Sequence, residues 1–358
     1  MSMKVAMLTS ADEVSDARLH RLANSLISAG ISVDIVALGK SIDAPQGSTF
    51  SRAPGGKSKF ARVFRDISIP LMARGDVWIV LAPDLLPTAF LIGKMRGKKI
   101  VADVHEDYVK LLRDRAWAKG VIGALAKLIA RLATFVAAQC DLTTVADAQV
   151  PPFNPHKRLV VRNLPDKSLL TQSKNPEGTP TALYIGDVRK SRGLFTMLAA
   201  AEKAPDWNFE IVGNISQAHA FEVELWKKNS PAASRVRFHG RLAPRAAWKL
   251  AENAWVGLTL LESTPAFIEA IPSKLYEYMS CGLATISTPL PRCKELIEKS
   301  RGGVLASTPD DVASFLNRWS SNHDEMNELR RNASKWSAEN LDSEREYLRF
   351  VEAVAELL

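Results

Sequence analysis

The sequence predicts an α/β protein built from two doubly wound parallel sheets. Short apolar runs alternate with amphipathic stretches in both halves of the chain, as expected where each strand is followed by a crossover helix. A polar stretch, residues 166–180, separates the two sets. The length of 358 residues also suits about two domains. We therefore expect domains at residues 1–165 and 181–336, joined by a linker at 166–180.

The first half opens with a strand at residues 4–10, where KVAMLTS ends in a polar turn. A helix is expected over residues 15–29, because apolar residues recur there at helical spacing and Gly30 can end it. Residues 40–59 are rich in Ser, Pro and Gly, which predicts a loop. Further buried strands are expected at residues 33–38, 76–81, 98–103 and 142–146, and residues 159–166 close this half.

The second half repeats the alternation. Strands are expected at residues 181–188, 209–214, 236–240, 255–261 and 283–288, with helices at 194–203, 220–229, 244–253 and 274–279. An amphipathic, helical stretch follows at residues 336–358. In such sheets, ligands bind beyond the carboxyl ends of the strands.

Charge is distributed unevenly along the chain. The formal net charge is +8, and all of the positive excess lies in residues 1–165, which carry 23 basic and 14 acidic side chains. This asymmetry favours an anionic partner for the first half. Basic residues cluster at 57–65, at 94–99 and at 110–119, the last just before an apolar helix at 121–138. An interfacial membrane contact and an ordinary solvated face over a core helix both explain this pattern.

Nothing in the sequence predicts export or a membrane span. The first residues lead directly into a strand, with no cleavage site behind them. The most apolar segment, 120–138, is interrupted by Lys127 and Arg131. We expect a cytoplasmic protein that can lie at the inner face of the cell membrane. The cysteines lack C-x-x-C spacing and are expected as core residues: Cys140, Cys281 and Cys293.

The turns after the first strand of each half argue against dinucleotide redox chemistry. The turn at residues 9–16 contains no glycine, and the turn at 186–193 has glycines only at its two ends. A G-x-G-x-x-G turn is typical of such cofactors. No P-loop or nucleophile-elbow pattern is present either.

The segment 260–289 carries the most informative chemistry. A loop after a strand contains Glu269, and Ser273 can cap a helix that starts at Lys274. Glu277 then lies one turn into that helix. A helix N-terminus suits a diphosphate, and a carboxylate one turn further in suits the hydroxyls of a ribose. Cations that can offset the phosphate charge follow the first strand of this half: Arg189, Lys190 and Arg192.

This ordered set of motifs resembles glycosyltransferase family 4, a group of retaining enzymes with the GT-B fold. The similar features are a glycine turn from Gly186 to Arg192-Gly193, the strand VRFHG at 236–240, the pair Glu269 and Glu277, and EYMSCGLATISTP at 277–289. The resemblance implies two Rossmann-like domains that face a central cleft, with a C-terminal helix at about 337–358 packed on the first domain. It also implies an N-terminal acceptor-binding domain and a C-terminal domain that binds the nucleotide sugar.

The resemblance implies roles for individual residues. Glu277 would hold the ribose, Glu269 would contact the donor sugar, and Arg192 would neutralise the departing diphosphate. His105 would line the cleft near the donor sugar and the acceptor. The remaining donor contacts are expected from Gly186, Arg189, Lys190, Ser273 and Lys274. Asp16 and Arg18, in the first turn, are expected to contact the acceptor.

The resemblance also implies the reaction. A hexose would pass from a nucleoside diphosphate sugar to a saccharide or a lipid-linked saccharide, with retained configuration and without a metal or another cofactor. Two departures from the family pattern leave the donor open: Asp187 stands where a basic residue often follows the glycine, and Ile271-Pro272 replaces the usual F-G.

Alternatives remain at this point. Asp103, His105 and Asp107 lie on one face of a strand end and could bind a divalent ion, although a polar cleft edge is the simpler interpretation. Few aromatic residues interleave the basic clusters, which argues against nucleic acid. A sugar-nucleotide epimerase of similar shape and a non-catalytic, membrane-recruited binding protein are the competing functions.

Overall fold

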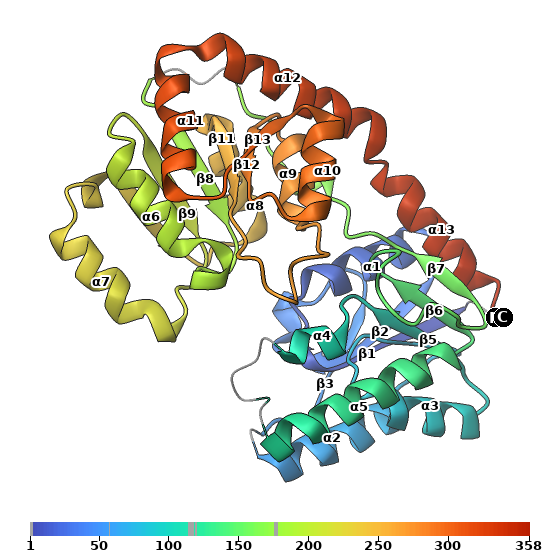
Figure 1. Cartoon of the computed structure of the whole chain (residues 1–358). Helices are drawn as coiled ribbons and strands as arrows, with labels where there is room; N and C mark the ends of the chain where they lie inside the picture. Colours follow the sequence, from blue (N-terminus) through green and yellow to red (C-terminus); the bar gives the residue numbers. More distant parts are fainter. Residues whose placement is uncertain (1–2, 57, 114–117, 119, 175–177) are drawn as a thin grey trace. The chain divides into compact units, whose positions relative to one another are not determined.

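The structure, a computed structural model, describes residues 3–56, 58–113, 118, 120–174 and 178–358. The chain forms two compact units (Figure 1). The first unit comprises Met1–Asn163 together with Ser343–Leu358, and the second comprises Leu164–Asp342. Each unit is a parallel sheet covered by helices on both faces.

The first unit contains a seven-stranded sheet of order β3-β2-β1-β4-β5-β6-β7. All of its neighbouring strands pair in parallel. The strands are β1 (Lys4–Glu13), β2 (Ser32–Leu38), β3 (Thr49–Arg52), β4 (Val77–Val80), β5 (Lys99–Val104), β6 (Leu142–Val145) and β7 (Arg158–Val160). The prediction of a continuous loop at 40–59 is therefore wrong. Thr49 donates its hydroxyl hydrogen to Asp34 at 2.6 Å, which helps to attach β3 as an edge strand despite its polar sequence.

The two faces of this sheet bury alternate residues of each strand. In β1, Val5 and Met7 pack on one face and Ala6 and Leu8 on the other, as the pleat requires. The first face is covered by α1 (Ala17–Ser28) and α13 (Ser343–Ala355). The opposite face is covered by α2 (Lys59–Met72), α3 (Leu86–Met95) and α5 (Gly120–Ala138), with α4 (Tyr108–Arg113) beside α5.

The second unit contains a six-stranded parallel sheet of order β10-β9-β8-β11-β12-β13. Its strands are β8 (Thr181–Ile185), β9 (Asn208–Val212), β10 (Val236–Gly240), β11 (Val256–Thr259), β12 (Ala284–Ser287) and β13 (Gly303–Leu305). Its helices are α6 (Leu194–Lys203), α7 (Ala220–Asn229), α8 (Pro244–Lys249), α9 (Ser273–Ser280), α10 (Pro291–Ser300), α11 (Pro309–Ser321) and α12 (His323–Asn340). The largest core cluster contains Trp207 and Trp319, which are fully buried.

The stretch expected as one helix at 336–358 is instead two. Helix α12 ends at Asn340 in the second unit, and α13 begins at Ser343 in the first. Leu341, between them, is fully buried and leaves the helical conformation with ψ of 77°. Asp342 and Ser343 are residue types preferred at helix starts, so a second helix begins there.

Side chains of α13 anchor it on the first unit. Phe350 and Val354 are fully buried in that unit's core. The carboxylate of Glu346 accepts hydrogen bonds from the backbone N–H of Arg162 at 2.9 Å and from its guanidinium at 3.2 Å. The described part of the segment 166–180 belongs to the second unit, where Gln172 donates to the carbonyl of Ser280 at 2.6 Å.

Candidate functional site

The strand order in the sheet of the second unit reverses between β8 and β11. Strands β9 and β10 lie on one side of β8, whereas β11, β12 and β13 follow on the other. The carboxyl ends of the two strands at such a reversal are where doubly wound sheets bind their ligands. The predicted donor residues all lie in the loops after β8 and β11 or at the start of the helices that follow them.

The loop after β8 is held in place by its neighbours. The backbone N–H of Gly186 donates to Val212, and that of Gly213 donates to Gly240, at 2.9 and 2.8 Å. A Cβ on Gly213 would lie 1.7 Å from the carbonyl oxygen of Gly186, so only glycine allows this approach. The hydroxyl of Tyr184 donates to the carbonyl of Asp187 at 2.7 Å. The turn that carries the cations is thus rigidly supported.

The loops after β8 and β11 also contact each other. The N–H of Glu262 donates to the carbonyl of Ser191 at 3.0 Å. Gly193, which precedes α6, has φ of 84°, and a Cβ there would lie 2.4 Å from the carbonyl oxygen of Leu260. Glycine is therefore required at this position for two separate reasons, conformation and space.

Helix α9 starts one residue earlier than the sequence indicated. Ser273 is its first residue, and Pro272 occupies the N-cap position with extended backbone angles. The prediction that Ser273 caps the helix is wrong, because the conformation of Pro272 already starts it. No side chain of the described residues caps α9. The N–H of Leu275 donates to the carbonyl of Pro272 at 3.0 Å, so the N–H groups of Ser273 and Lys274 are left for another acceptor.

Lys274 brings this helix start close to the glycine turn. A Cβ on Gly186 would lie 3.0 Å from Cε of Lys274, so the lysine stem crosses directly over the glycine. Gly186 has φ of 155°. Among the described residues, the ammonium group of Lys274 makes no ion pair, and neither does that of the exposed Lys190. Both can therefore offer their charge to an anion.

Arg192 lies in the same region. Its guanidinium carbon is 5.5 Å from the centre of the Phe267 ring, and its Nε is 4.0 Å from the exposed carboxylate of Asp187. The Nε–H group is buried and donates no hydrogen bond within the described part of the chain. Arg189, next in the turn, is half-buried and already has a partner. Asp187 therefore moderates the charge of this turn without removing it.

The two predicted carboxylates have different surroundings. Glu277 is 6% exposed and lies one turn into α9. Glu269 is exposed in a turn, and its backbone carbonyl accepts a hydrogen bond from Arg292 at 3.2 Å. No hydrogen bond joins Glu269 to Glu277 among the described residues. Burial thus commits Glu277 to a fixed position, whereas Glu269 is free to adapt.

Tyr278 is a positioning residue that the sequence interpretation missed. Its hydroxyl oxygen accepts a hydrogen bond from the N–H of Ile185 at 2.9 Å, which connects α9 to the end of β8. Its ring covers Gly257 so closely that a Cβ there would lie 2.2 Å from the ring. A glycine inside a strand that faces an aromatic residue on a helix was the available signal.

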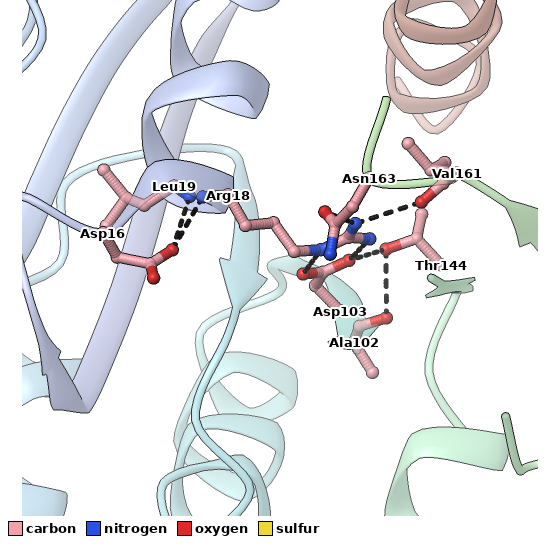
Figure 2. A network of polar contacts seen from close by, with 8 residues as sticks. All are labelled: Asp16, Arg18, Leu19, Ala102, Asp103, Thr144, Val161 and Asn163. Carbon is pink, nitrogen blue, oxygen red and sulfur yellow. Dashed lines mark hydrogen bonds and ion pairs between the residues drawn. The ribbon is translucent and has the colours of Figure 1, made fainter. Parts of the chain in front are cut away.

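In the first unit, Arg18 has a structural role. It is buried and donates to both oxygens of Asp103, at 2.6 and 2.7 Å, as well as to Val161 and Asn163, at 3.0 and 2.7 Å (Figure 2). Burial alone would raise the pKa of Asp103, but attraction and hydrogen bonds from Arg18 outweigh it and hold that pKa below its usual value. The donors of Arg18 are thus already satisfied inside the unit, which argues against the predicted contact of Arg18 with the acceptor.

Asp16 lies in the same region of the first unit. One of its oxygens accepts from the N–H groups of Arg18 and Leu19, each at 2.9 Å, and so caps α1. Figure 2 shows Asp16 at the helix start and Thr144 on the far side of Asp103. Thr144 donates to Asp103 at 2.6 Å. Asp16 as an acceptor contact stays a prediction.

His105 follows this network on the chain, just beyond β5. Its ring lies edge-on to Tyr108 at 6.2 Å, and its Nδ1 is buried without a hydrogen-bond partner among the described residues. Asp107 caps the next helix by accepting from Val109 and Lys110. The described part of the chain contains no cluster of three potential metal ligands. Asp103 and Asp107 already have protein partners, which argues against the metal interpretation of this strand end.

A second feature of the first unit escaped the sequence interpretation. The strand order in its sheet reverses between β1 and β4. There, the hydroxyl of Ser10 donates to Asp84 at 2.8 Å, and Arg65 donates to the carbonyl of Ser10 at the same distance. Burial and the nearby charge of Asp84 raise the pKa of Asp66 to about 6, against the opposing charge of Arg65. Ser10, Arg65 and Asp84 are far apart in sequence, so only the fold brings them together.

Comparison with known proteins agrees with this description. Residues 166–336 match the family model "Glycosyl transferases group 1". No curated protein matches the sequence significantly. The sucrose-phosphate synthase of Thermosynechococcus elongatus has a similar structure, with a TM-score of 0.76 at 14% identity over 99% of each chain. HepE of Anabaena, solved with UDP and glucose, has a TM-score of 0.77 at 14% identity over 99% of this chain and 100% of its own.

A third similar structure is that of WaaG, a glycosyltransferase involved in lipopolysaccharide biosynthesis. It has a TM-score of 0.70 at 13% identity and covers 98% of this chain and 99% of its own. At such low identities, these likenesses establish the fold. The chain therefore has the GT-B fold, and its second unit matches the glycosyl transferases of group 1.

Proposed function

We propose that this protein is a retaining glycosyltransferase of family 4. It would transfer a hexose from a nucleoside diphosphate sugar to a saccharide or lipid-linked saccharide acceptor. The match of residues 166–336 to group 1 glycosyl transferases supports the transferase class. Similar structures have been solved with UDP, with UDP and glucose and with UDP-glucose, which supports a nucleotide sugar as donor.

One observation carries this proposal: uncapped helix α9, Lys274 and the cationic turn meet at the reversal of the second sheet. A diphosphate bound there would accept hydrogen bonds from the first N–H groups of α9, at Ser273 and Lys274. Lys190, Arg189 and Arg192 would balance its charge, and the absence of a side chain at Gly186 would let the phosphates approach the backbone. Glu277, buried in α9, would hold the ribose hydroxyls.

The chemical step follows from this binding mode. The acceptor hydroxyl oxygen forms a bond to the anomeric carbon while the bond from that carbon to the diphosphate oxygen breaks. The hydroxyl proton passes to an oxygen of the departing phosphate. Attack on the face from which the diphosphate leaves retains the configuration. Arg192 and Lys274 would stabilise the negative charge that develops, as preorganised donors do in other transferases.

We propose no metal for this step, since cationic side chains and a helix start are available for the diphosphate. Glu269 is exposed and adaptable, which suits a contact to the donor sugar that forms on binding. Two contacts stay predictions: that of His105 near the donor sugar and the acceptor, and that of Asp16 with the acceptor. A role in the synthesis of cell-envelope polysaccharide or glycolipid, in the cytoplasm or at its membrane, is part of the same proposal.

Donor screening tests the proposal. UDP, GDP, ADP and their sugars would be compared by the unfolding temperature of the protein, because a specific ligand stabilises the folded state. With the best donor and a panel of saccharide acceptors, release of nucleoside diphosphate should depend on the acceptor. Glu277→Ala should abolish this release, whereas Glu224→Ala, an exposed control on α7, should not change it.

The products decide between the competing functions. A glycoside whose anomeric configuration equals that of the donor, determined by NMR, supports retention. An isomeric nucleotide sugar formed without acceptor would establish an epimerase instead. Nucleotide binding without turnover on any acceptor would favour a binding protein. Full activity of Glu277→Ala would refute the site.

A further inference from the structure

The helical layer α2, α3 and α5 of the first unit presents an apolar outer face. Among the described residues, 13 of the 20 exposed large hydrophobic side chains lie on these three helices. The most prominent are Phe64 of α2, Met95 of α3, and Val121, Leu128 and Phe135 of α5, exposed by between 61% and 86%. We call this surface, the exposed side of α2, α3 and α5, the apolar face. A concentration of this kind usually marks an interaction site.

Helix α5 explains how the face arises. It packs on the unit through small residues, Gly123, Ala130, Ala133 and Ala137, and leaves its large side chains outside. Gly120–Ala138 is long and apolar enough to cross a membrane by length and composition, yet only 22% of its most apolar stretch is buried in the unit. In a core helix of a soluble domain, large residues would point inward.

The packing of α5 favours a helix that stays on its sheet. It contacts α3 and β5, and Ala130 and Ala137 belong to the core cluster that also contains Trp78 and Ile100. Withdrawing α5 to span a bilayer would expose this cluster to water. With α5 packed on the unit in this way, its large side chains face outward and are available to a partner.

Charge identifies the kind of partner. The sequences of α2, α3 and α5 contain six basic residues and a single acid, Asp66; of the six, Arg65 is buried and Lys94 pairs with Asp141. One carboxylate oxygen of Asp66 is buried, and Asp84 is near enough to raise its pKa, so this acid lies toward the carboxyl ends of β1 and β4. Arg62 and Arg131 are exposed beside the apolar side chains. A second copy of the chain would oppose cations with cations, whereas an anionic surface would attract them.

We propose that the apolar face docks on an anionic phospholipid bilayer, with α5 lying in the plane of the interface. Val121, Leu128 and Phe135 would enter the boundary between head groups and acyl chains. Arg131 and the half-buried Lys127 would extend their stems along the apolar surface and place their charges among the phosphates. Lys57, Arg115 and Lys119, part of the basic clusters predicted from sequence, lie outside the described residues.

Vesicle flotation tests this proposal without any donor or acceptor, so its outcome is independent of the proposed transferase activity. The whole protein should float with vesicles of phosphatidylcholine that contain about 30% phosphatidylglycerol, and much less with phosphatidylcholine alone. Raising the salt concentration from about 0.1 M to about 1 M should weaken the initial attraction. Equal binding to neutral vesicles, or no binding to anionic ones, would overturn the proposal.

Variants locate the contact. Leu125→Ser combined with Leu128→Ser should weaken partitioning by more than about tenfold, because both side chains are exposed and would enter the bilayer. Arg131→Gln should weaken it about fivefold. Matched controls on the second unit, Phe221→Ser and Arg245→Gln, should leave it unchanged.

Two further measurements complete the test. Circular dichroism should show that the variants keep the fold, as expected for exposed positions. Sedimentation equilibrium without vesicles should give a monomer. A dimer that Leu128→Ser dissociates would assign the face to a second copy of the chain, and unchanged flotation of all α5 variants would place the contact elsewhere; either result overturns the proposal.

Discussion

Two arginine residues, one in each unit, are used in opposite ways. In the first unit, Arg18 is buried and its donors are bound by Asp103, Val161 and Asn163. In the second unit, Arg192 stacks near Phe267 and keeps a buried Nε without a hydrogen-bond partner from the described residues. A cation whose hydrogen bonds are complete supports the fold, whereas one whose hydrogen bonds are incomplete is available to a ligand.

The most severe test of this contrast is to remove the partner of Arg18. Asp103→Ala would leave a buried, uncompensated charge and should destabilise the first unit by about 3–5 kcal/mol. Amide hydrogen exchange would measure this loss of stability as faster exchange in β1 and β5. The amides of β8 and β11, in the second unit, should exchange as slowly as in the parent protein. Asp76→Ala, which removes an exposed pair with Lys98, should change stability by about 1 kcal/mol at most. A loss for Asp103→Ala as small as the control's would show that Arg18 is not structurally committed.

The corresponding change in the second unit should affect activity instead of stability. Arg192→Ala should lower the rate of nucleoside diphosphate release by about 10²–10³-fold, because a preorganised cation at the leaving group is lost. The unfolding temperature should remain that of the parent protein. Arg245→Ala, an exposed arginine on α8, is the control. If Arg192→Ala unfolds the unit, the contrast between the two arginines fails.

Lys274 sharpens the contrast further, since it makes no ion pair among the described residues. Lys274→Met keeps the stem over Gly186 and removes only the charge, so affinity for the nucleoside diphosphate should fall about tenfold. Isothermal titration calorimetry would measure this, with Lys299→Met as a control on an exposed pair. Unchanged affinity would show that the lysine serves the loop and not the ligand.

The smallest effect concerns Asp66, a carboxylate of the first unit that is less completely satisfied than Asp103. Its pKa is raised from 3.8 to about 6, so the folded state favours the protonated form. The parent protein should therefore lose stability as pH rises from about 4 to about 6. Asp66→Asn should remove this loss and be more stable at pH 8 by about 1 kcal/mol, after allowance for solvent screening.

Thermal unfolding at pH 4 and pH 8 would measure the effect of Asp66→Asn. The variant and the parent protein should behave alike at the lower pH. Asp43→Asn, an exposed carboxylate, should behave like the parent protein at both values. A variant that is less stable than the parent at pH 8 would contradict the raised pKa.

Hydrophobic periodicity was sufficient to predict most strands, because buried parallel strands are short and almost wholly apolar. It failed at β3, whose sequence TFSR is polar and whose place depends on pairing with β2. It also failed at Leu341, where a buried apolar residue continued the helical pattern while the backbone left it. Edge strands and helix breaks depend on contacts that no local pattern encodes.

The candidate site shows the same division. Residues in one loop or one helix turn, such as Glu277 and Lys274, could be predicted because their spacing is local. The role of Arg18 could not, because its partners Asp103 and Asn163 lie 85 and 145 positions away. Tyr278 and Gly257 are likewise joined only across the fold. Long-range pairs decide which predicted cations are free to bind a ligand.

The place of α13 has a consequence for biosynthesis. Phe350 and Val354 complete the core of the first unit, although nearly 180 residues of the second unit separate them from Asn163. During synthesis on the ribosome, the second unit can therefore fold as soon as Asp342 has emerged, while the first unit still lacks part of its hydrophobic core. The earlier-made half must wait for residues 343–358, so it is the last to mature and the more exposed to chaperones and proteases during translation.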